Sequence, residues 1–393
     1  MRIRTGHSSS MPHTTLASQA LEPGIMTKGP LLRLALFEDY DQIAALGAAN
    51  GLSTQSLEQW LHLWRENPAY QQLPGWPIGW VLEDEDERIV GAVDNVPCLY
   101  RFGGRTYVGA FGRGWVVDIR YRAFALLLQV KQRRQPDVDL RLTNTASPRT
   151  SVLLTKRGWS QVPIGEWDRS VFWVTSYAQA VLRYLAAKMS RPVSAVARPL
   201  LYPPLLLTDL MSRFPRRFKI GCELGWSASF DERFDRFWEE LESRNPRLLL
   251  SVRNRQTLLW HFKYALKQNR IWILTASDGP RLLAYAILQR QDARSVDLTR
   301  MLLIDFQSLD KDQDLTSAMI SYVLERCRRE RIHVLENVGC WLEKRQPLVH
   351  RAPHRRALGN WCYLYQAANQ ELSSALQSAD SWYPTQYDAD ASL

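Results

Sequence analysis

The sequence predicts a mixed α/β protein made of two copies of one fold, and three observations support this. The chain has 393 residues, which exceeds one typical domain and is enough for two hydrophobic cores. The first half runs strand, helices, antiparallel strands, helix, strand, an order typical of a mixed sheet with one crossover helix. The same order recurs in the second half at an offset of about 190 residues, which indicates a duplication.

The first copy is expected to follow a disordered tail. Residues 1–28 are polar, rich in Ser and Thr, and lack the apolar region of a secretory signal; Met11 or Met26 could also start the chain. After the tail, apolar alternation predicts strands, helical spacing predicts helices, and Asn-Pro or acidic clusters predict stops and turns. In order, these patterns predict a strand at 31–37, helices at 38–50 and 56–70, a hairpin at 79–100 that turns at 83–87, two strand patterns over 105–119, a helix from 124, and strands at 138–144 and 169–175.

The second copy is recognised by matching segments. The hairpins at 79–93 and 271–287 each follow a helix that carries tryptophan, so we expect them in equivalent places. We therefore expect an N-terminal domain at 29–175, a helical connector at 176–220 and a C-terminal domain at 221–393.

Composition narrows the partners and the compartment. The formal charge of +10 suggests an anionic partner, but no zinc knuckle, aromatic RNA-binding signature or long basic tract accompanies it, which argues against nucleic acid. Five cysteines without a CxxC spacing, and histidines without ligand spacing, argue against a disulfide framework and a metal site. No apolar run is long enough to span a bilayer, and a cytoplasmic protein is expected.

The connector allows two interpretations. Residues 176–219 are rich in Leu and Arg and are interrupted by prolines. A basic amphipathic segment of this kind could make peripheral contact with an anionic membrane, or it could pack between the two domains, and we favour packing.

One joint between a strand and a helix carries the strongest chemical signal. In GWVVDIRYRAFALLLQVKQRR (114–134), a buried strand pattern turns into a basic helix at Arg120, Arg122, Ala123 and Ala125. This joint, with the strand order and the hairpin, resembles the GNAT superfamily of acyl-coenzyme A-dependent N-acyltransferases, whose corresponding loop has the pattern [QR]-x-x-G-x-[GA]. The resemblance covers most of the chain and implies two tandem GNAT-like domains, the first closer to the family pattern.

The family pattern fits the joint in two frames. One frame begins at Arg120 and keeps small residues at both glycine positions, whereas the other begins at Arg122 and places Leu127 at one of them. In such a joint, backbone N–H groups and arginines hold a pyrophosphate, and small residues allow close approach. Leu127 would weaken or reshape that contact, and a plain turn with surface arginines stays open as the alternative.

A second element follows the next strand. TNTASPRTSVLLTKRGW (143–159) is similar to the family's N-x-x-A-x-x-x-Y-x-K-x-G-F element through Asn144, Lys156, Gly158 and Trp159. The tyrosine that serves many members as general acid is replaced here by Leu154. Catalysis would then need another donor or water.

The resemblance implies a site in the first copy. It implies that acetyl-CoA or another acyl-CoA is the co-substrate, that the acyl group passes to the amino group of a small-molecule acceptor, and that Asp118 is the first candidate base, with Asp94 and Glu166 as weaker ones. The implied cofactor-binding residues are Val116, Val117, Arg120, Arg122, Ala123, Phe124, Ala125 and Asn144.

The second copy departs further from the pattern, since QSLDKDQDL (307–315) places aspartates where phosphate would bind. We expect that this half has lost the cofactor. The leading hypothesis is therefore an N-acyltransferase, with an amino sugar of a cell-envelope or polysaccharide pathway as an acceptor by analogy. The alternatives are a catalytically silent module that binds a ligand or partner, and a membrane or surface-glycan assembly factor acting through 176–219.

Overall fold

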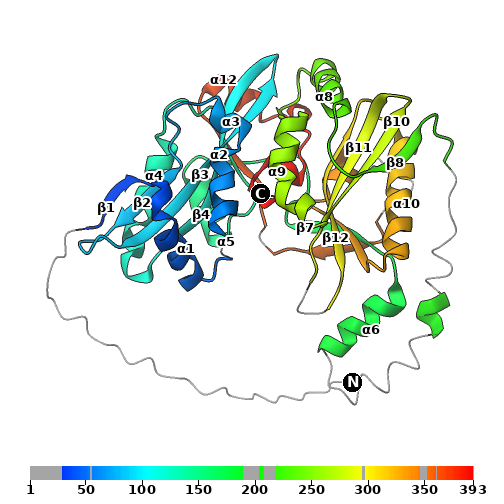
Figure 1. The fold of residues 1–393 in the computed structure, drawn as a ribbon, viewed down its shortest axis with the longest axis horizontal. Helices are drawn as coiled ribbons and strands as arrows, with labels where there is room; N and C mark the ends of the chain where they lie inside the picture. The colour runs from blue at the N-terminus through cyan, green and yellow to red at the C-terminus, as the bar shows by residue number, and fades with distance from the viewer. Residues whose placement is uncertain are drawn as a thin grey trace, which may run out of the picture.

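The structure is a computed structural model that describes residues 29–53, 55–188, 203–207, 218–293, 297–345, 352–359 and 361–392. It contains two mixed β-sheets that lie side by side with helices around them (Figure 1). This mixed α/β architecture confirms the predicted fold class. The expected tail at 1–28 and most of the connector at 176–220 lie outside the described residues.

The described residues of the first half form seven strands. They match the predicted patterns with two exceptions: 105–119 forms one long strand rather than two, and β6 was not predicted. The strands are β1 (Leu31–Leu34), β2 (Gly79–Glu83), β3 (Ile89–Phe102), β4 (Arg105–Val117), β5 (Leu140–Thr143), β6 (Ser160–Gln161) and β7 (Arg169–Val174). The helices are η1 (Phe37–Asp39), α1 (Tyr40–Ala49), α2 (Leu57–Arg65), α3 (Pro68–Gln71), η2 (Ile119–Phe124), α4 (Ala125–Arg133), α5 (Pro148–Lys156) and α6 (Tyr177–Lys188).

The second half repeats this order and ends in short helices. The strands are β8 (Glu223–Ser227), β9 (Leu250–Ser251), β10 (Ile271–Asp278), β11 (Arg281–Arg290), β12 (Arg300–Ser308), β13 (Val334–Val338), β14 (His354–Ala357) and β15 (Leu364–Ala367). The helices are α8 (Arg233–Arg244), α9 (Arg255–Lys267), α10 (Gln313–Arg329), α11 (Trp341–Arg345), α12 (Gln370–Ala375), η4 (Ala379–Ser381), η5 (Gln386–Asp388) and η6 (Asp390–Ser392).

The two sheets share one topology. The first has the order β1-β2-β3-β4-β5-β15-β6 and the second the order β8-β10-β11-β12-β13-β7-β14. The short strand β9 also belongs to the first sheet, where it pairs with the end of β3. Each contains one parallel pair at the same place, β4 with β5 and β12 with β13. The hairpins β2–β3 and β10–β11 are therefore equivalent, and the predicted duplication is confirmed.

The two sheets exchange one strand, which the sequence analysis did not foresee. The strand predicted at 169–175 was expected to close the first sheet, but β7 pairs with β13 and β14 in the second, where Val171 faces Asn337. In return β15 pairs with β5 and β6 in the first sheet, where Leu364 faces Thr143. A strand pattern reveals a buried strand but not its partner, because both sheets offer equivalent edges.

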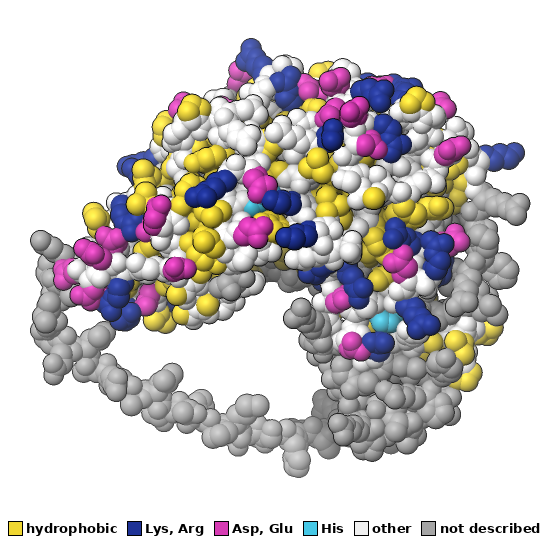
Figure 2. Space-filling model, viewed as in Figure 1, with side chains coloured by type: hydrophobic (Ala, Val, Ile, Leu, Met, Phe, Trp, Pro, Cys, Tyr) yellow, Lys and Arg dark blue, Asp and Glu magenta, His cyan; other side chains and the backbone are white. Residues whose placement is uncertain are grey.

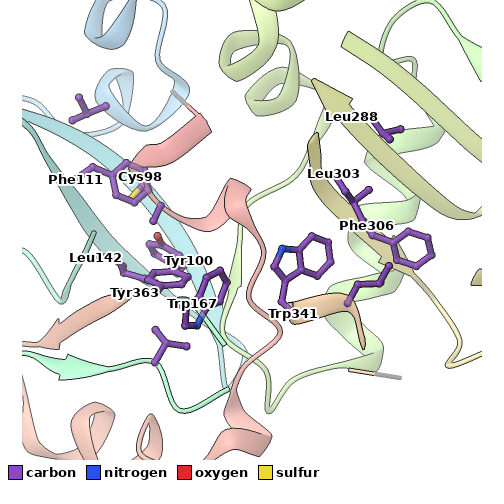
Figure 3. Close-up of a cluster of buried hydrophobic side chains, with 14 of the residues drawn as sticks. Cys98, Tyr100, Phe111, Leu142, Trp167, Leu288, Leu303, Phe306, Trp341 and Tyr363 are labelled. Carbon is purple, nitrogen blue, oxygen red and sulfur yellow. The ribbon is translucent and has the colours of Figure 1, made fainter. Parts of the chain in front are cut away.

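One hydrophobic core runs across both halves. It joins Tyr100 and Tyr363 on the side of the first sheet to Trp341 and Phe306 on the side of the second (Figure 3). The ring of Trp167, in the loop before β7, contacts the ring of Tyr363 edge to face, with ring centroids 4.8 Å apart. The exchanged strands therefore belong to the shared core rather than to its periphery.

Helices α2 and α9, which are equivalent in the two copies, meet through a reciprocal contact. The indole Nε1 of Trp260 donates to the carbonyl oxygen of His62 at 2.9 Å, and Nε2 of His62 lies 2.8 Å from the carbonyl oxygen of Trp260. This pairing fixes the two halves against each other next to the site described below.

Candidate active site

Strands β4 and β5 separate in the middle of the first sheet. Their parallel pairing covers only Gly109 to Phe111 against Leu140 to Leu142, although β4 continues to Val117. Beyond this point, Gly114 and Trp115 of β4 together face one residue of β3, which is a β-bulge. Gly114 has a φ of +62°, which suits glycine. The bulge interrupts the ladder and opens the backbone of β4 at the separation.

A buried carboxylate lies beside this bulge. Asp94 of β3 faces Arg113 of β4 across the ladder and is only 9% exposed. Both carboxylate oxygens accept from the indole Nε1 of Trp60 at 3.3 Å. Burial raises the pKa of Asp94 to about 6, against the opposing effects of the Arg113 charge and the Trp60 hydrogen bond. Asp94 is therefore poised to exchange a proton near neutral pH.

Arg113 is under the electrostatic influence of carboxylates from both halves. Its guanidinium donates to the side chain of Gln55 at 2.9 Å, and burial lowers its pKa while Asp94 and Asp390 oppose this effect. Arg113 thus carries a positive charge into a poorly solvated region between two acidic groups.

The end of the chain fills the gap between β4 and β5. Helix η6 contacts both strands, and the carboxylate of Asp390 accepts the backbone N–H of Asn144 at 2.8 Å together with the hydroxyls of Thr143 and Thr145. Burial raises the pKa of Asp390, and these hydrogen bonds oppose the increase. A residue from the far end of the sequence therefore binds the end of β5.

A buried ionic network holds this terminal segment in place. Arg253 is 1% exposed, and its guanidinium bonds Asp305 of β12 at 2.9 Å and Asp388 of η5 at 2.6 Å. The remaining donors reach the carbonyl oxygen of Ser251 at 2.8 Å and the hydroxyl of Thr385 at 3.3 Å. Because both carboxylates share one cation, the segment that carries Asp390 is fixed to the second sheet.

Two small cavities lie between the halves on the same side of the sheet as Asp94. One of about 260 Å³ is lined by Cys98, Phe111 and polar side chains of both halves, and one of about 100 Å³ is lined by Gln55. His261 lines both cavities and bonds Ser392 at 2.9 Å. Burial lowers the pKa of His261 to about 3, so its imidazole is neutral at physiological pH.

The joint after β4 forms a short 3-10 helix, η2, before α4. Asp118 caps η2, and its carboxylate accepts the backbone N–H of Arg120 at 2.9 Å while its carbonyl oxygen accepts that of Tyr121. The guanidinium of Arg120 also donates to Asp118, which lowers the pKa of Asp118 to about 2. Asp118 is thus a weak base, and the N–H groups expected for phosphate are partly occupied by it.

The other predicted cofactor residues are spread along this joint. Val116 is buried and Val117 half-buried at the end of β4, and Arg122 and Ala123 are exposed in η2. Phe124 and Ala125 are half-buried where η2 passes into α4, and Asn144 is buried at the end of β5. Val116 to Ala125 form one continuous segment, and Asn144 directly follows β5.

Leu154 and Leu127, which depart from the family pattern, and Glu166, a weaker candidate base, have the following surroundings. Leu154 is 3% exposed and packs with Trp159 and Leu364 in a separate small cluster. Leu127 is 42% exposed on α4. Glu166 pairs with Arg355 at 3.3 Å, at the strand exchange.

The corresponding joint of the second half is occupied by acidic groups. Asp312 caps α10 by accepting the backbone N–H groups of Asp314 and Leu315, and Asp310 pairs with Arg244 at 2.8 Å. Negative charge therefore stands at this helix start, as the sequence predicted.

Sequence reasoning did not find Arg113, Arg253 or Asp390 as members of the site. Arg113 follows a Phe-Gly pair in β4 and gave no separate signal. Arg253 and Asp390 come close to β4 and β5 only through the fold, since they lie more than a hundred residues further along the chain. A local motif does not contain this information.

Charge and metal-ligand patterns show no other concentrated feature. On the face shown in Figure 2, basic, acidic and hydrophobic side chains of the described residues are interspersed. In the described ranges, no group of three His, Cys, Asp or Glu residues is arranged to hold a metal ion. No helix among these residues is both long and apolar enough to cross a bilayer.

Known structures resemble this fold at low sequence identity. No family model and no curated protein sequence matches the chain. A GCN5-related N-acetyltransferase from Anabaena variabilis is 13% identical over 86% of this chain and 73% of its own, with a TM-score of 0.51. A probable N-acyltransferase from Enterococcus faecalis is 11% identical over 86% and 72%, with a TM-score of 0.55.

A eukaryotic enzyme has the same likeness. The Saccharomyces cerevisiae N-myristoyltransferase, solved with bound myristoyl-CoA, is 10% identical over 88% of this chain and 82% of its own, with a TM-score of 0.51. Together with the duplicated sheet order, these likenesses show that the chain has a tandem fold like that of GCN5-related N-acetyltransferases and N-myristoyltransferase.

Proposed function

We propose that this protein is an N-acyltransferase that moves an acyl group from acyl-CoA to the amino group of a small acceptor. The observation that carries this proposal is Asp94, a buried carboxylate with a pKa of about 6 beside the bulge where β4 leaves β5. Buried groups with pKa values near the working pH gather at catalytic sites. In this proposal Asp94 replaces Asp118, the first candidate base of the sequence analysis.

The reaction needs one proton acceptor. As the acceptor nitrogen forms its bond to the thioester carbonyl carbon, it must lose a proton, and ionised Asp94 takes it. The carbon–sulfur bond then breaks, and the sulfur leaves as a thiolate, whose thiol has a pKa of about 8.5 and which takes its proton from solvent. The open backbone at the bulge supplies N–H groups for the charge that develops on the carbonyl oxygen.

The joint after β4 is the proposed place of the cofactor. Val116 and Val117 would lie along the pantetheine arm, and Arg120 and Arg122 would bind the pyrophosphate next to the small Ala123 and the neighbouring residues Phe124, Ala125 and Asn144. Arg120 now pairs with Asp118 on the surface, where solvent screens such a pair and leaves it weak. A pyrophosphate with its larger charge can therefore take the place of Asp118.

The cavities between the halves are the proposed place of the acceptor. The larger one is lined by Glu242, Asn254 and Thr257 together with the rings of Trp238 and Trp260. Hydrogen-bonding groups beside aromatic faces suit a hydroxylated amine, which supports an amino sugar of an envelope or polysaccharide pathway as acceptor. The smaller cavity is connected to Asp94, because its lining residue Gln55 accepts from Arg113, which faces Asp94 across the ladder.

Thiol release from acyl-CoA with a panel of amino sugars, amino acids and short peptides tests the reaction. We expect turnover with at least one amine, a loss of about 10²–10⁴-fold in Asp94→Asn, and a change of a few fold in Asp118→Asn. A large loss in Asp118→Asn with full activity in Asp94→Asn would assign the base to Asp118 and reject our choice.

Calorimetry with CoA tests the cofactor site separately. Reversal of Arg120 and Arg122 to Glu should weaken CoA binding at least tenfold, because attraction becomes repulsion at one place. The matched reversal of Arg328 and Arg329 on α10 should leave binding nearly unchanged. Equal losses in both double variants would indicate diffuse electrostatics rather than a site.

A catalytically silent module is the second candidate, favoured by the buried Leu154 at the position of the usual acid. It predicts CoA binding at the joint without thiol release for any amine.

A further inference from the structure

A further cavity lies outside the proposed active site. It has a volume of about 780 Å³ and is lined by residues of β1, the loop at 73–77, β2 and α4, elements that lie at the outer end of the first half (Figure 1). This volume falls within the range of about 300–1,000 Å³ that is typical of small-molecule sites. Asp94, Arg113 and the joint residues Val116 to Ala125 are absent from its lining.

The wall of this cavity is mainly apolar. Its apolar residues include Leu32, Leu34, Trp76, Trp80, Leu127 and Val130. Leu34 and Leu127 are 53% and 42% exposed, so apolar surface continues from the wall to the solvent. The indole Nε1 of Trp80 is buried and has no hydrogen-bond partner within the described residues. The wall thus offers much apolar area and one unused donor.

The rim of this cavity is positively charged. Lys131 in the last turn of α4 and Arg134, which follows α4, border it, and neither forms an ion pair with a described residue. Asp137 is the one acidic side chain of the lining. Cations are common at the last turn of a helix, where they favour the helix dipole. The positive rim has two explanations, stabilisation of the helix end and binding of an anion. Arg133 also lies in the last turn of α4 but does not border the cavity, so a substitution there tests the first explanation alone.

We propose that this cavity binds a single-chain fatty acid or a similar monoacyl anion. The chain lies against the leucine and tryptophan wall, and the anionic head group lies between Lys131 and Arg134. An apolar chain with one negative end matches the apolar wall and the excess of one positive charge on the rim. The site is separate from the proposed acyl-transfer site and does not depend on it.

Calorimetry on the full chain with sodium dodecanoate tests this proposal. We expect one saturable site, and each methylene added to the chain should raise the affinity about fourfold, which corresponds to about 0.8 kcal/mol per methylene. Saturating CoA should leave the affinity unchanged, because the two ligands occupy different places. Dodecanol, which lacks the charge, should bind at least fivefold more weakly.

Matched variants make the test specific to the cavity. Lys131→Glu with Arg134→Glu should lower dodecanoate affinity at least tenfold, whereas Arg133→Glu on the same helix should change it less than twofold. Leu127→Glu should weaken binding in the same way, and Val152→Glu, which places the same charge at an exposed apolar position of α5, should not. Circular dichroism and melting temperature show whether each variant is folded.

Three results would overturn the proposal. They are the absence of saturable dodecanoate binding, an equal loss in Arg133→Glu and in the double variant, and displacement of dodecanoate by CoA. Cosedimentation with phosphatidylcholine vesicles that contain phosphatidylglycerol distinguishes a membrane surface from the cavity. Binding to vesicles without binding of monomeric dodecanoate is a case of the first result and would assign the apolar patch to a membrane surface.

Discussion

Asp94→Asn should stabilise the protein at neutral pH while it removes the proposed base. In the folded protein burial raises the pKa of Asp94 from 3.8 to about 6. The shift corresponds to about 3 kcal/mol at 1.36 kcal/mol per pH unit. Asn has nearly the shape of the protonated acid and does not titrate, and its side-chain oxygen can still accept from Trp60. The variant therefore avoids the cost of a buried negative charge.

The raised pKa of Asp94 determines the pH range over which the wild type and Asp94→Asn differ in stability. Below pH 4, Asp94 is protonated in both the folded and the unfolded state, so its charge does not affect the comparison. Between pH 4 and 6 the unfolded state releases the proton while the folded state retains it, so the wild type loses stability relative to the variant as the pH rises. Above pH 6 the difference reaches its full value of about 3 kcal/mol.

Urea unfolding of both proteins from pH 4 to 8 measures this difference, since titrations elsewhere in the chain are common to both. Asp118→Asn is the control, because Asp118 has a lowered pKa and lies at the surface. It should show no gain in stability above pH 6. A difference between Asp94→Asn and the wild type that stays constant from pH 4 to 8 would refute the reasoning.

Two further substitutions test the packing around the site by urea unfolding. Arg253→Met should cost about 3–5 kcal/mol because it leaves two buried carboxylates without their cation, whereas Arg101→Met, which breaks a partly exposed pair, should cost about 1 kcal/mol or less; similar losses would contradict the buried network. Gly339→Ala should be more harmful than Gly359→Ala. Both have positive φ, but only at Gly339 would a Cβ atom overlap the Trp167 ring, and equal losses would mean that the loop before β7 moves freely.

Much of the fold could be predicted from local patterns. The hairpin at 79–93, the strand-to-helix joint after β4 and their repetition in the second half all follow from apolar spacing and turn residues, which act over a few positions. The exchange of β7 and β15 could not be predicted in this way. It depends on which of two equivalent sheet edges each strand reaches, and the strand sequence does not differ between the two choices.

The candidate site was predicted in part for the same reason. The joint residues lie within one segment, so a motif could identify them. Our proposal moves the base from Asp118 to Asp94, and the two residues differ in burial rather than in residue type. Asp118 stands at a surface turn with an arginine, whereas Asp94 is covered by Trp60 and lies opposite Arg113. Only the packed structure separates the two pKa values.

The second half contributes to the candidate site through the strand exchange and the terminal segment that carries Asp390. It does so although its own joint at 307–315 carries aspartates where phosphate would bind. The second half supplies β15 as the neighbour of β5, and it supplies Asp390, which binds the end of that strand where β4 turns away. Arg253 and Asp305 of the second half hold the segment that carries Asp390. The gap between β4 and β5 is thus shaped by residues from both halves, and a substitution in the buried network of the second half can alter the proposed site in the first.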